Sequence, residues 1–301
     1  MKRRHLLRVV DLSKEEIISL WDSALRLKTL KVLPRSLEGK IMALIFEKPS
    51  TRTRVSFESA MLKLGGGSIF LSTKDLQLSR GEPIKDTARV LSRYVDVVVL
   101  RTYKHETIEE FAGYANIPVI NGLSDKHHPC QALSDFLTLY ELGRLSPEEK
   151  IVWIGDGNNV AHSWLEICAI LGLPIVVCCP EGYDPDQNLI KELKTRYQAS
   201  IEVVRDPKVA LKEASIVSTD VWASMGQEEE AERRKEAFKP YQLNSELLEL
   251  ARSDVLVLHC LPAHRGEEIT EEVLEGRNSV VWLQAENKMW LHMALLEFML
   301  L

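Results

Sequence analysis

The fold of the chain is decided by the stretch from residue 41 to residue 67, IMALIFEKPSTRTRVSFESAMLKLGGG. Its first six residues, Ile41–Phe46, are continuously apolar, which is typical of a strand buried on both faces. A helix face follows, marked by apolar residues three or four positions apart: Phe57, Ala60, Met61 and Leu64. Three glycines then end the helix. A buried strand followed by an amphipathic helix is the repeating unit of parallel α/β sheets.

The same alternation continues along the chain on both sides of a polar segment, Gly143–Lys150. Further strands are predicted at Ser68–Leu71, Val95–Leu100, Ile117–Ile120, Ile151–Ile154, Ile175–Cys179, Ile201–Val204, Ile216–Thr219, Val255–His259 and Val280–Leu283. Helices are predicted after a capping box of Ser13 and Glu16, and at Ile84–Tyr94, Glu106–Ala115, Pro129–Leu142, Val160–Leu171, Pro185–Tyr197, Lys208–Ala214, Glu228–Phe238 and Glu286–Leu301. We therefore expect an α/β protein with two doubly wound parallel-sheet domains, residues 1–142 and 151–285. The C-terminal helix, 286–301, is expected to return to the first domain.

Length and composition agree with this organisation. The 301 residues suffice for two domains of about 150 residues each. Hydrophobic residues make up 45% and charged residues 27%, which is typical of a globular chain rather than a disordered one. The 38 Lys and Arg against 44 Asp and Glu give a net charge of −6, which does not favour a nucleic-acid partner.

The cellular compartment of the protein is predicted from three sequence features. No apolar run reaches the ~18 residues of a membrane span, and the basic start has no apolar core of a signal peptide. The five cysteines form no CxxC pair. A reducing cytoplasm fits this usage.

An anion site is predicted where the first strand meets its helix. Three hydroxyls and two guanidiniums, from Ser50, Thr51, Arg52, Thr53 and Arg54, crowd the first helical turn. Free N–H groups and the helix dipole favour an anion there, and a guanidinium binds phosphate through a planar fork. The alternative is a capped helix with solvated arginines, and Arg54 could instead pair with a carboxylate.

Further polar residues follow later strands, and ligands bind beyond the carboxyl ends of parallel strands. Arg101 comes after the run 97–100, and His128 with Gln131 opens a helix, where both can hydrogen-bond a small carbonyl or amide group. Two alternatives remain for His128. It could be a satisfied structural histidine, or it could bind a metal with Cys130, although no second ligand pair at metal spacing accompanies them.

The second half offers three more candidate segments. Gly155–Ser163 mimics a dinucleotide fingerprint, with Val160 where the third glycine belongs, but the amides of Asn158 and Asn159 could hold the carboxylate of a zwitterion. Asp220 could accept from a substrate ammonium, and the charged run after Gly226, Gln227–Lys239, is expected to be a solvated helix. Cys260 could be a nucleophile, but without an assigned base a ligand contact is the better interpretation.

Taken together, these motifs resemble the aspartate/ornithine carbamoyltransferase family, and its ornithine branch in particular. The Ser-Thr-Arg-Thr-Arg loop and the His-Pro-Cys-Gln segment, residues 50–54 and 128–131, are shared with the wider family. Asp220 with Ser224-Met225-Gly226, the segment 155–163 and His259-Cys260-Leu261-Pro262 are similar to the ornithine branch. The resemblance runs from Phe46 to Lys288 and so covers nearly the whole chain.

The resemblance implies an enzyme that transfers the carbamoyl group of carbamoyl phosphate to the side-chain amine of L-ornithine, giving L-citrulline and phosphate, in arginine metabolism. It implies no metal and no organic cofactor. Domain 1–142 with 286–301 would bind carbamoyl phosphate, and domain 151–285 would bind ornithine. The family also has a cis bond before the proline that corresponds to Pro262.

Site residues are carried over by motif. Carbamoyl phosphate would contact Ser50, Thr51, Arg52, Thr53, Gln77, Arg101, His128, Gln131, Cys260, Leu261 and Lys288. Ornithine would contact Asn159, Asp220, Ser224 and Met225. The residues that act in the reaction would be Arg101, His128, Asp220 and Cys260. Gln77 would reach a neighbouring subunit, which implies a homotrimer or a multiple of trimers, with no nucleic-acid or membrane partner.

One position departs from the family pattern. Where the family's C-terminal motif has an arginine, this chain has Lys288, which keeps the charge but loses the bidentate fork.

Two functions outside the family are the alternatives. One is a nicotinamide-dependent dehydrogenase that uses 155–160, and the other is a phosphate or amino-acid sensor without catalysis. Within the family, Asp220 argues against aspartate as the acceptor, and putrescine would not need the Ser224–Gly226 loop.

Overall fold

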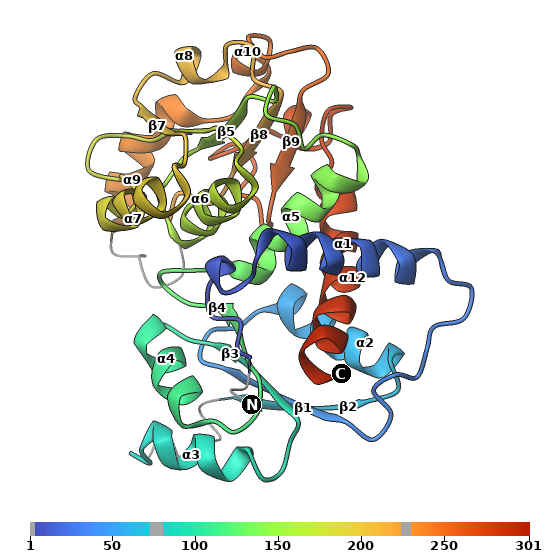
Figure 1. The fold of residues 1–301 in the computed structure, drawn as a ribbon. Coiled ribbons are helices and arrows are strands. Elements are labelled where there is room, and N and C mark those ends of the chain that lie inside the picture. Colours follow the sequence, from blue (N-terminus) through green and yellow to red (C-terminus); the bar gives the residue numbers. More distant parts are fainter. Residues whose placement is uncertain (1–3, 73–80, 224–229) are drawn as a thin grey trace. The chain divides into compact units, whose positions relative to one another are not determined.

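The computed structural model describes residues 4–72, 81–223 and 230–301 (Figure 1). The chain forms two compact units, Met1–Leu137 with Glu286–Leu301, and Thr138–Ala285. The C-terminal segment therefore belongs with the first unit, as expected. The domain limits that the sequence suggests stay a prediction.

The first unit contains a parallel sheet in the order β2-β1-β3-β4. Its strands are β1 (Ile41–Phe46), β2 (Gly67–Ser72), β3 (Val97–Arg101) and β4 (Val119–Leu123). The helices with residues in this unit are α1 (Lys14–Thr29), α2 (Thr51–Lys63), α3 (Ile84–Leu91), α4 (His105–Tyr114), α5 (Pro129–Glu141) and α12 (Val281–Leu300), after a short 3-10 turn at Val9–Asp11. Side chains that alternate along the central strands, such as Ala43 and Ile45, pack with α3 and α4 on one face. This arrangement buries β1 and β3 on both sides, which explains their continuous apolar sequences.

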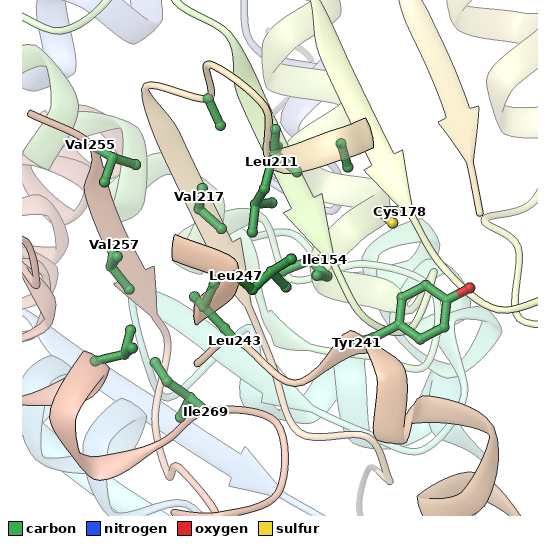
Figure 2. Packing of buried hydrophobic residues seen from close by; sticks show 14 of the residues in the cluster. Ile154, Cys178, Leu211, Val217, Tyr241, Leu243, Leu247, Val255, Val257 and Ile269 are labelled. Carbon is green, nitrogen blue, oxygen red and sulfur yellow. The ribbon is translucent and has the colours of Figure 1, made fainter. Parts of the chain in front are cut away.

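The second unit contains a parallel sheet in the order β7-β6-β5-β8-β9. Its strands are β5 (Ile151–Ile154), β6 (Ile175–Cys178), β7 (Ile201–Val204), β8 (Ile216–Thr219) and β9 (Leu256–His259). Its helices are α6 (Asn159–Leu171), α7 (Gln187–Tyr197), α8 (Pro207–Leu211), α9 (Ala231–Phe238), α10 (Ser245–Leu248) and α11 (Glu271–Leu274), with a 3-10 turn at Lys239–Tyr241. Figure 2 shows the core of this unit, where Ile154, Val217 and Val257 of three neighbouring strands meet the helix side chain Leu247.

Most sequence-predicted elements are present, and one is wrong. The capping box of α1 is formed, because Ser13 Oγ accepts from Glu16 N and Glu16 Oε2 accepts from Ser13 N. The segment Val280–Leu283, predicted as a strand, instead opens α12. Val280 still donates to Val257 O at 3.0 Å, but its own carbonyl accepts from Gln284, the first helical bond. A four-residue apolar run is compatible with a short buried strand or with a helical turn. Here the segment is helical because apolar positions continue beyond it along α12.

No helix within residues 4–72, 81–223 and 230–301 is both long and apolar enough to cross a bilayer.

Candidate active site

The first candidate segment caps helix α2 of the first unit. Ser50 is the N-cap, and its Oγ accepts from Thr53 N at 3.3 Å. Thr51 and Arg52 are exposed in the first turn, which contains no acidic residue, whereas Thr53 is buried. The helix terminus therefore presents amide groups and a guanidinium without a carboxylate of its own turn to compete for an anion.

Arg54 does not share this environment. Its Nε lies 3.2 Å from Glu58 Oε1 on the same helix, and its guanidinium lies 3.6 Å from the centroid of the Phe70 ring. The prediction that Arg54 pairs with a carboxylate is confirmed. Of the two arginines in the motif, Arg52 is exposed, whereas Arg54 is half-buried and engaged by Glu58 and Phe70.

Arg101 lies at the same edge of the sheet as the Ser50–Thr53 segment. It is the last residue of β3, in register with Phe46 at the end of β1, and its carbonyl accepts from Glu47 N at 2.8 Å. The side chain is buried, with 6% exposed. The carboxyl ends of two neighbouring strands thus bring Arg101 and the start of the loop to the same edge of the sheet.

Gln131 and Lys288 are in direct contact in the first unit. Lys288 Nζ donates to Gln131 Oε1 at 2.7 Å, and Gln131 Nε2 donates to Asp135 Oδ1 at 2.7 Å. All three side chains are buried. Asp135 is not among the predicted site residues, although its position one helical turn after Gln131 could have suggested the pair.

His128 is buried beside two cations. Burial, and then the charges of Lys288 and Arg101, lower the pKa of His128 well below its ordinary value. The imidazole is therefore neutral at physiological pH, and its N–H can donate to a carbonyl oxygen. The alternative of a metal thiolate at Cys130 is disfavoured, because burial raises the pKa of Cys130 to about 12 and its Sγ donates to Asn121 O at 3.5 Å.

A second buried histidine near this cluster was not predicted. His292 follows Lys288 by one turn of α12 and stacks on Phe57 of α2, with ring centroids 3.6 Å apart. Burial and the Lys288 charge lower its pKa well below the ordinary value. Among the described residues, neither of its ring nitrogens has a hydrogen-bond partner.

The glycine-rich turn of the second unit leads from β5 into α6. A Cβ at Gly157 would lie 2.2 Å from Pro185 N and 2.5 Å from the carbonyl carbon of Asp184. The glycine is required because the chain's own backbone approaches it closely. A bound pyrophosphate is not needed to explain this glycine, which removes the main support for the dinucleotide interpretation.

Asp220 is held by three donors at the end of β8. Asn158 Nδ2 donates to Oδ2 at 3.0 Å, while Val221 N at 2.9 Å and Cys260 Sγ at 3.2 Å donate to Oδ1. Asp220 is 7% exposed. Three donors hold the carboxylate in a fixed orientation. Because Cys260 donates its thiol proton here, the geometry fits a ligand contact better than a thiolate nucleophile.

Asn158, which precedes the predicted Asn159, has two roles. Its side-chain oxygen caps α6 by accepting from Val160 N at 2.9 Å and Ala161 N at 3.1 Å. Its amide nitrogen holds Asp220. Asn158 is therefore engaged within the protein. Asn159, the second of the two predicted amides, lies in the first turn of α6 and is 9% exposed.

The Cys260-Leu261 turn is fixed by its neighbour His259. His259 Nδ1 accepts from Leu261 N at 2.9 Å, and Nε2 lies 2.9 Å from Glu268 Oε1, so the ring is the Nε2–H tautomer. Leu261 has φ 57°, and the bond to Pro262 is cis, as the family resemblance implies. Asp220, His259 and Cys260 each bring a possible metal ligand within 4.8 Å of the others, but both nitrogens of His259 are occupied.

The charged run Gln227–Lys239 is not uniformly solvated. Its described part includes α9, in which Arg234 is buried and pairs with Asp156, while the neighbouring Arg233 is exposed. The prediction of a solvated helix is therefore wrong for Arg234. The signal was its spacing: Phe238 follows four residues later on the same helix face, and that face is the buried one.

Three predicted site residues, Gln77, Ser224 and Met225, lie outside the described residues. The others fall in two groups, one in each unit. Ser50, Thr51, Arg52, Thr53, Arg101, His128, Gln131 and Lys288 belong to the first unit, and Asn159, Asp220, Cys260 and Leu261 belong to the second.

Both units match a described family. Residues 4–141 match the carbamoyl-P binding domain of aspartate/ornithine carbamoyltransferase, and residues 148–299 match the Asp/Orn binding domain. An α/β carbamoyl-transfer enzyme is the class that this fold and these matches define. The chain belongs to the aspartate/ornithine carbamoyltransferase family.

Individual relatives within that family include several ornithine carbamoyltransferases. The chain is 52% identical over 296 residues to the ornithine carbamoyltransferase of Desulfotalea psychrophila, covering 97% of this chain and 98% of the relative. The structure of ornithine carbamoyltransferase from Pyrococcus furiosus superposes with a TM-score of 0.92 at 51% identity, covering 97% and 96% of the two chains. The structure of anabolic ornithine carbamoyltransferase from Campylobacter jejuni superposes with a TM-score of 0.93 at 43% identity, and 98% of each chain is covered.

Proposed function

We infer that the chain transfers the carbamoyl group of carbamoyl phosphate to the side-chain amine of L-ornithine, giving L-citrulline and phosphate, in arginine metabolism. The observation that carries the choice of acceptor is the triply hydrogen-bonded carboxylate of Asp220. A fixed, buried negative charge attracts the ammonium groups of ornithine and repels the second carboxylate of aspartate. The named relatives are ornithine carbamoyltransferases, which supports the same choice.

The first unit is proposed to bind carbamoyl phosphate. Ser50, Thr51, Arg52 and Thr53 at the α2 terminus would hold the phosphate, because free amides, hydroxyls and a guanidinium meet there. The carbamoyl carbonyl would be held by Arg101 and the neutral His128, and its amide by Gln131, which Lys288 and Asp135 orient. Cys260 and Leu261 are proposed to contact the substrates from the second unit, and Gln77 from a neighbouring subunit.

The reaction is attack of a neutral amine on the carbamoyl carbon, through a tetrahedral intermediate that expels phosphate. Negative charge grows on the carbonyl oxygen, where Arg101 and His128 would act as preorganised donors. Arg52 and the α2 terminus would stabilise charge on the leaving phosphate. The amine must first lose a proton with a pKa near ~10.4, which costs roughly 4–5 kcal/mol at neutral pH.

Asp220 is proposed to orient ornithine rather than to take this proton. A carboxylate beside the reacting amine would favour its charged form and so raise the cost of deprotonation. Contact with the α-ammonium, together with Asn159, Ser224 and Met225, avoids this penalty. A second proton leaves the nitrogen after the C–N bond has formed, and the phosphate that departs as the C–O bond breaks is proposed to accept this second proton.

We propose further that the enzyme is a homotrimer, or a multiple of trimers, in the cytoplasm. Two apolar side chains one heptad apart on α2, Val55 and Leu62, are exposed, as is Ile69 of the adjacent edge strand β2. Exposed apolar residues on an edge strand and its covering helix favour association with a further copy. None of the cysteines forms a disulfide in the described part of the chain, which supports a reducing compartment. The mass of the protein in solution tests the assembly.

A citrulline assay with carbamoyl phosphate and three acceptors offered separately tests the function. Ornithine should give product, whereas aspartate and putrescine should give little. Product from aspartate or putrescine instead of ornithine would overturn the acceptor. Binding of both substrates without any product would favour the sensor, and quenching of NADH fluorescence on addition of protein would favour the dehydrogenase.

A further inference from the structure

Arg234 of α9 joins two separate segments of the second unit. Its Nε donates to the carbonyl oxygen of Trp222 at 2.7 Å, and its Nη2 pairs with the carboxylate of Asp156. The side chain is 4% exposed, so water does not compete for these contacts. A helix in a highly charged stretch thus buries one guanidinium that binds both a carbonyl and a carboxylate.

The plane of the guanidinium is also packed. Its central carbon lies 4.8 Å from the centroid of the Tyr183 ring and 5.6 Å from that of Phe238. The carbonyl of Tyr183 accepts from Gly157 N at 3.0 Å. Arg234 therefore contacts the turn after β5 twice, directly at Asp156 and through the residue that holds Gly157.

The two segments joined by Arg234 are the segments that hold Asp220. Asp156 lies two residues before Asn158, whose amide donates to Asp220 at 3.0 Å. Trp222 lies two residues after Asp220 on the other segment. The contacts close a ring that runs from Arg234 through Asp156, Asn158, Asp220 and Trp222 back to Arg234.

We propose that Arg234 is a positioning residue for the amino-acid substrate: by fixing Asp156 and Trp222, it holds Asp220 and Asn158 in the orientation that binds ornithine. The inference rests on the proposed function, in which Asp220 contacts ornithine. An arginine is required because one rigid fork reaches the carbonyl and the carboxylate together while its face packs on a ring. A lysine keeps the charge but offers a single ammonium in place of the fork.

Steady-state citrulline formation by Arg234→Gln and Arg234→Lys, beside the exposed neighbour Arg233→Ala as matched control, tests the proposal. We expect the KM for ornithine to rise roughly tenfold or more in Arg234→Gln and by less in Arg234→Lys. The Kd for inorganic phosphate, measured by calorimetry, should stay within about twofold, because its site lies in the other unit. Arg233→Ala should resemble the unchanged protein in both constants.

A double-mutant cycle separates positioning from general stabilisation. If Arg234 acts through Asp220, Arg234→Gln should add little to the KM for ornithine once Asp220→Asn is present, so the two effects are strongly non-additive. Additive effects would overturn the proposal. So would an unchanged ornithine KM in folded Arg234→Gln, or in Arg234→Lys if the glutamine variant does not fold. A wild-type protein that makes no citrulline would overturn the proposed function itself, and this inference with it.

Discussion

The ammonium of Lys288 and the side-chain oxygen of Gln131 lie 2.7 Å apart, within the first unit of the chain. The contact fixes the amide, with its oxygen towards the lysine and its nitrogen towards Asp135. Lys288, at the position where the resemblance implies an arginine, thus donates to Gln131, a proposed site residue. An arginine fork could reach two acceptors at once, whereas Lys288 acts as a point charge.

Lys288→Met should weaken carbamoyl phosphate binding. The change removes the donor to Gln131 Oε1, one of the two printed contacts that orient this buried amide, so we expect the KM for carbamoyl phosphate to rise roughly tenfold or more. The KM for ornithine should change less than about twofold. Lys28→Met is the control, because Lys28 is a second lysine beside α12 whose ammonium donates to Asn287, the residue before Lys288. Equal effects of both variants on the KM for carbamoyl phosphate would contradict the prediction.

Arg52 and Arg54 should behave differently although both belong to one motif. Arg52→Gln should reduce the affinity for phosphate by about 10- to 100-fold, since a charge-assisted hydrogen bond contributes about 1.5–3 kcal/mol. Arg54→Gln should have a much smaller effect, because Arg54 is engaged with Glu58 and Phe70. Calorimetric titration with inorganic phosphate measures both. A larger loss in the Arg54 variant would show that the anion lies elsewhere.

Asp220→Asn should raise the KM for ornithine more than it lowers kcat. The amide keeps the size of the side chain but loses the charge that attracts an ammonium, so we expect a KM increase of roughly tenfold or more. Carbamoyl phosphate affinity should be preserved. A variant with normal ornithine binding and a loss confined to kcat would instead make Asp220 the base.

His292→Phe should make the protein more stable in mild acid. The pKa of His292 is lowered in the folded state, so below about pH 6.5 the unfolded chain binds more protons than the folded chain. The free energy of unfolding is therefore not reduced by His292 above that pH, and it decreases as the pH falls towards the folded-state pKa of His292. Phenylalanine keeps the ring over Phe57 without this loss.

Chemical denaturation at pH 8 and at pH 5.5 measures the effect. The gain in free energy of unfolding from His292→Phe should be larger at pH 5.5 than at pH 8. His264→Gln, at a half-exposed histidine, is the control, for which we expect a change within about 0.5 kcal/mol at either pH. A gain that does not depend on pH would mean that His292 is not the buried neutral group responsible.

Sequence patterns were sufficient for local structure wherever one signal was strong. The bounds of β1, β5, β7 and β8 agree with the predicted strands, because each is a short apolar run between clear turn residues. The pattern failed at Val280–Leu283, since periodicity cannot separate a short buried strand from the first turn of an apolar helix. The short helices α10 and α11 were not predicted, because four residues are too few to show a period.

The candidate site was predictable only as a set of residue types. Arg101, His128 and Asp220 are predicted as candidates because each lies at or just after the end of a strand or at the start of a helix. Their supporting partners, Asp135, Asn158 and Arg234, were not assigned these roles, because those depend on contacts between residues far apart in sequence or on burial within a charged run. Motifs point to candidate ligand-binding groups more readily than to the groups that hold those candidates in place.

The double role of Asn158 limits which residue can stand at that position. Aspartate would cap α6 equally well, yet it would set a second negative charge against Asp220 at hydrogen-bond distance. Serine or threonine would also cap the helix, but neither reaches the carboxylate with a spare N–H. Aspartate, serine and threonine could each cap the helix, but only asparagine also donates a hydrogen bond to Asp220. We therefore expect functional variants to keep asparagine at residue 158, and the reason would be its contact with the carboxylate rather than its role in folding.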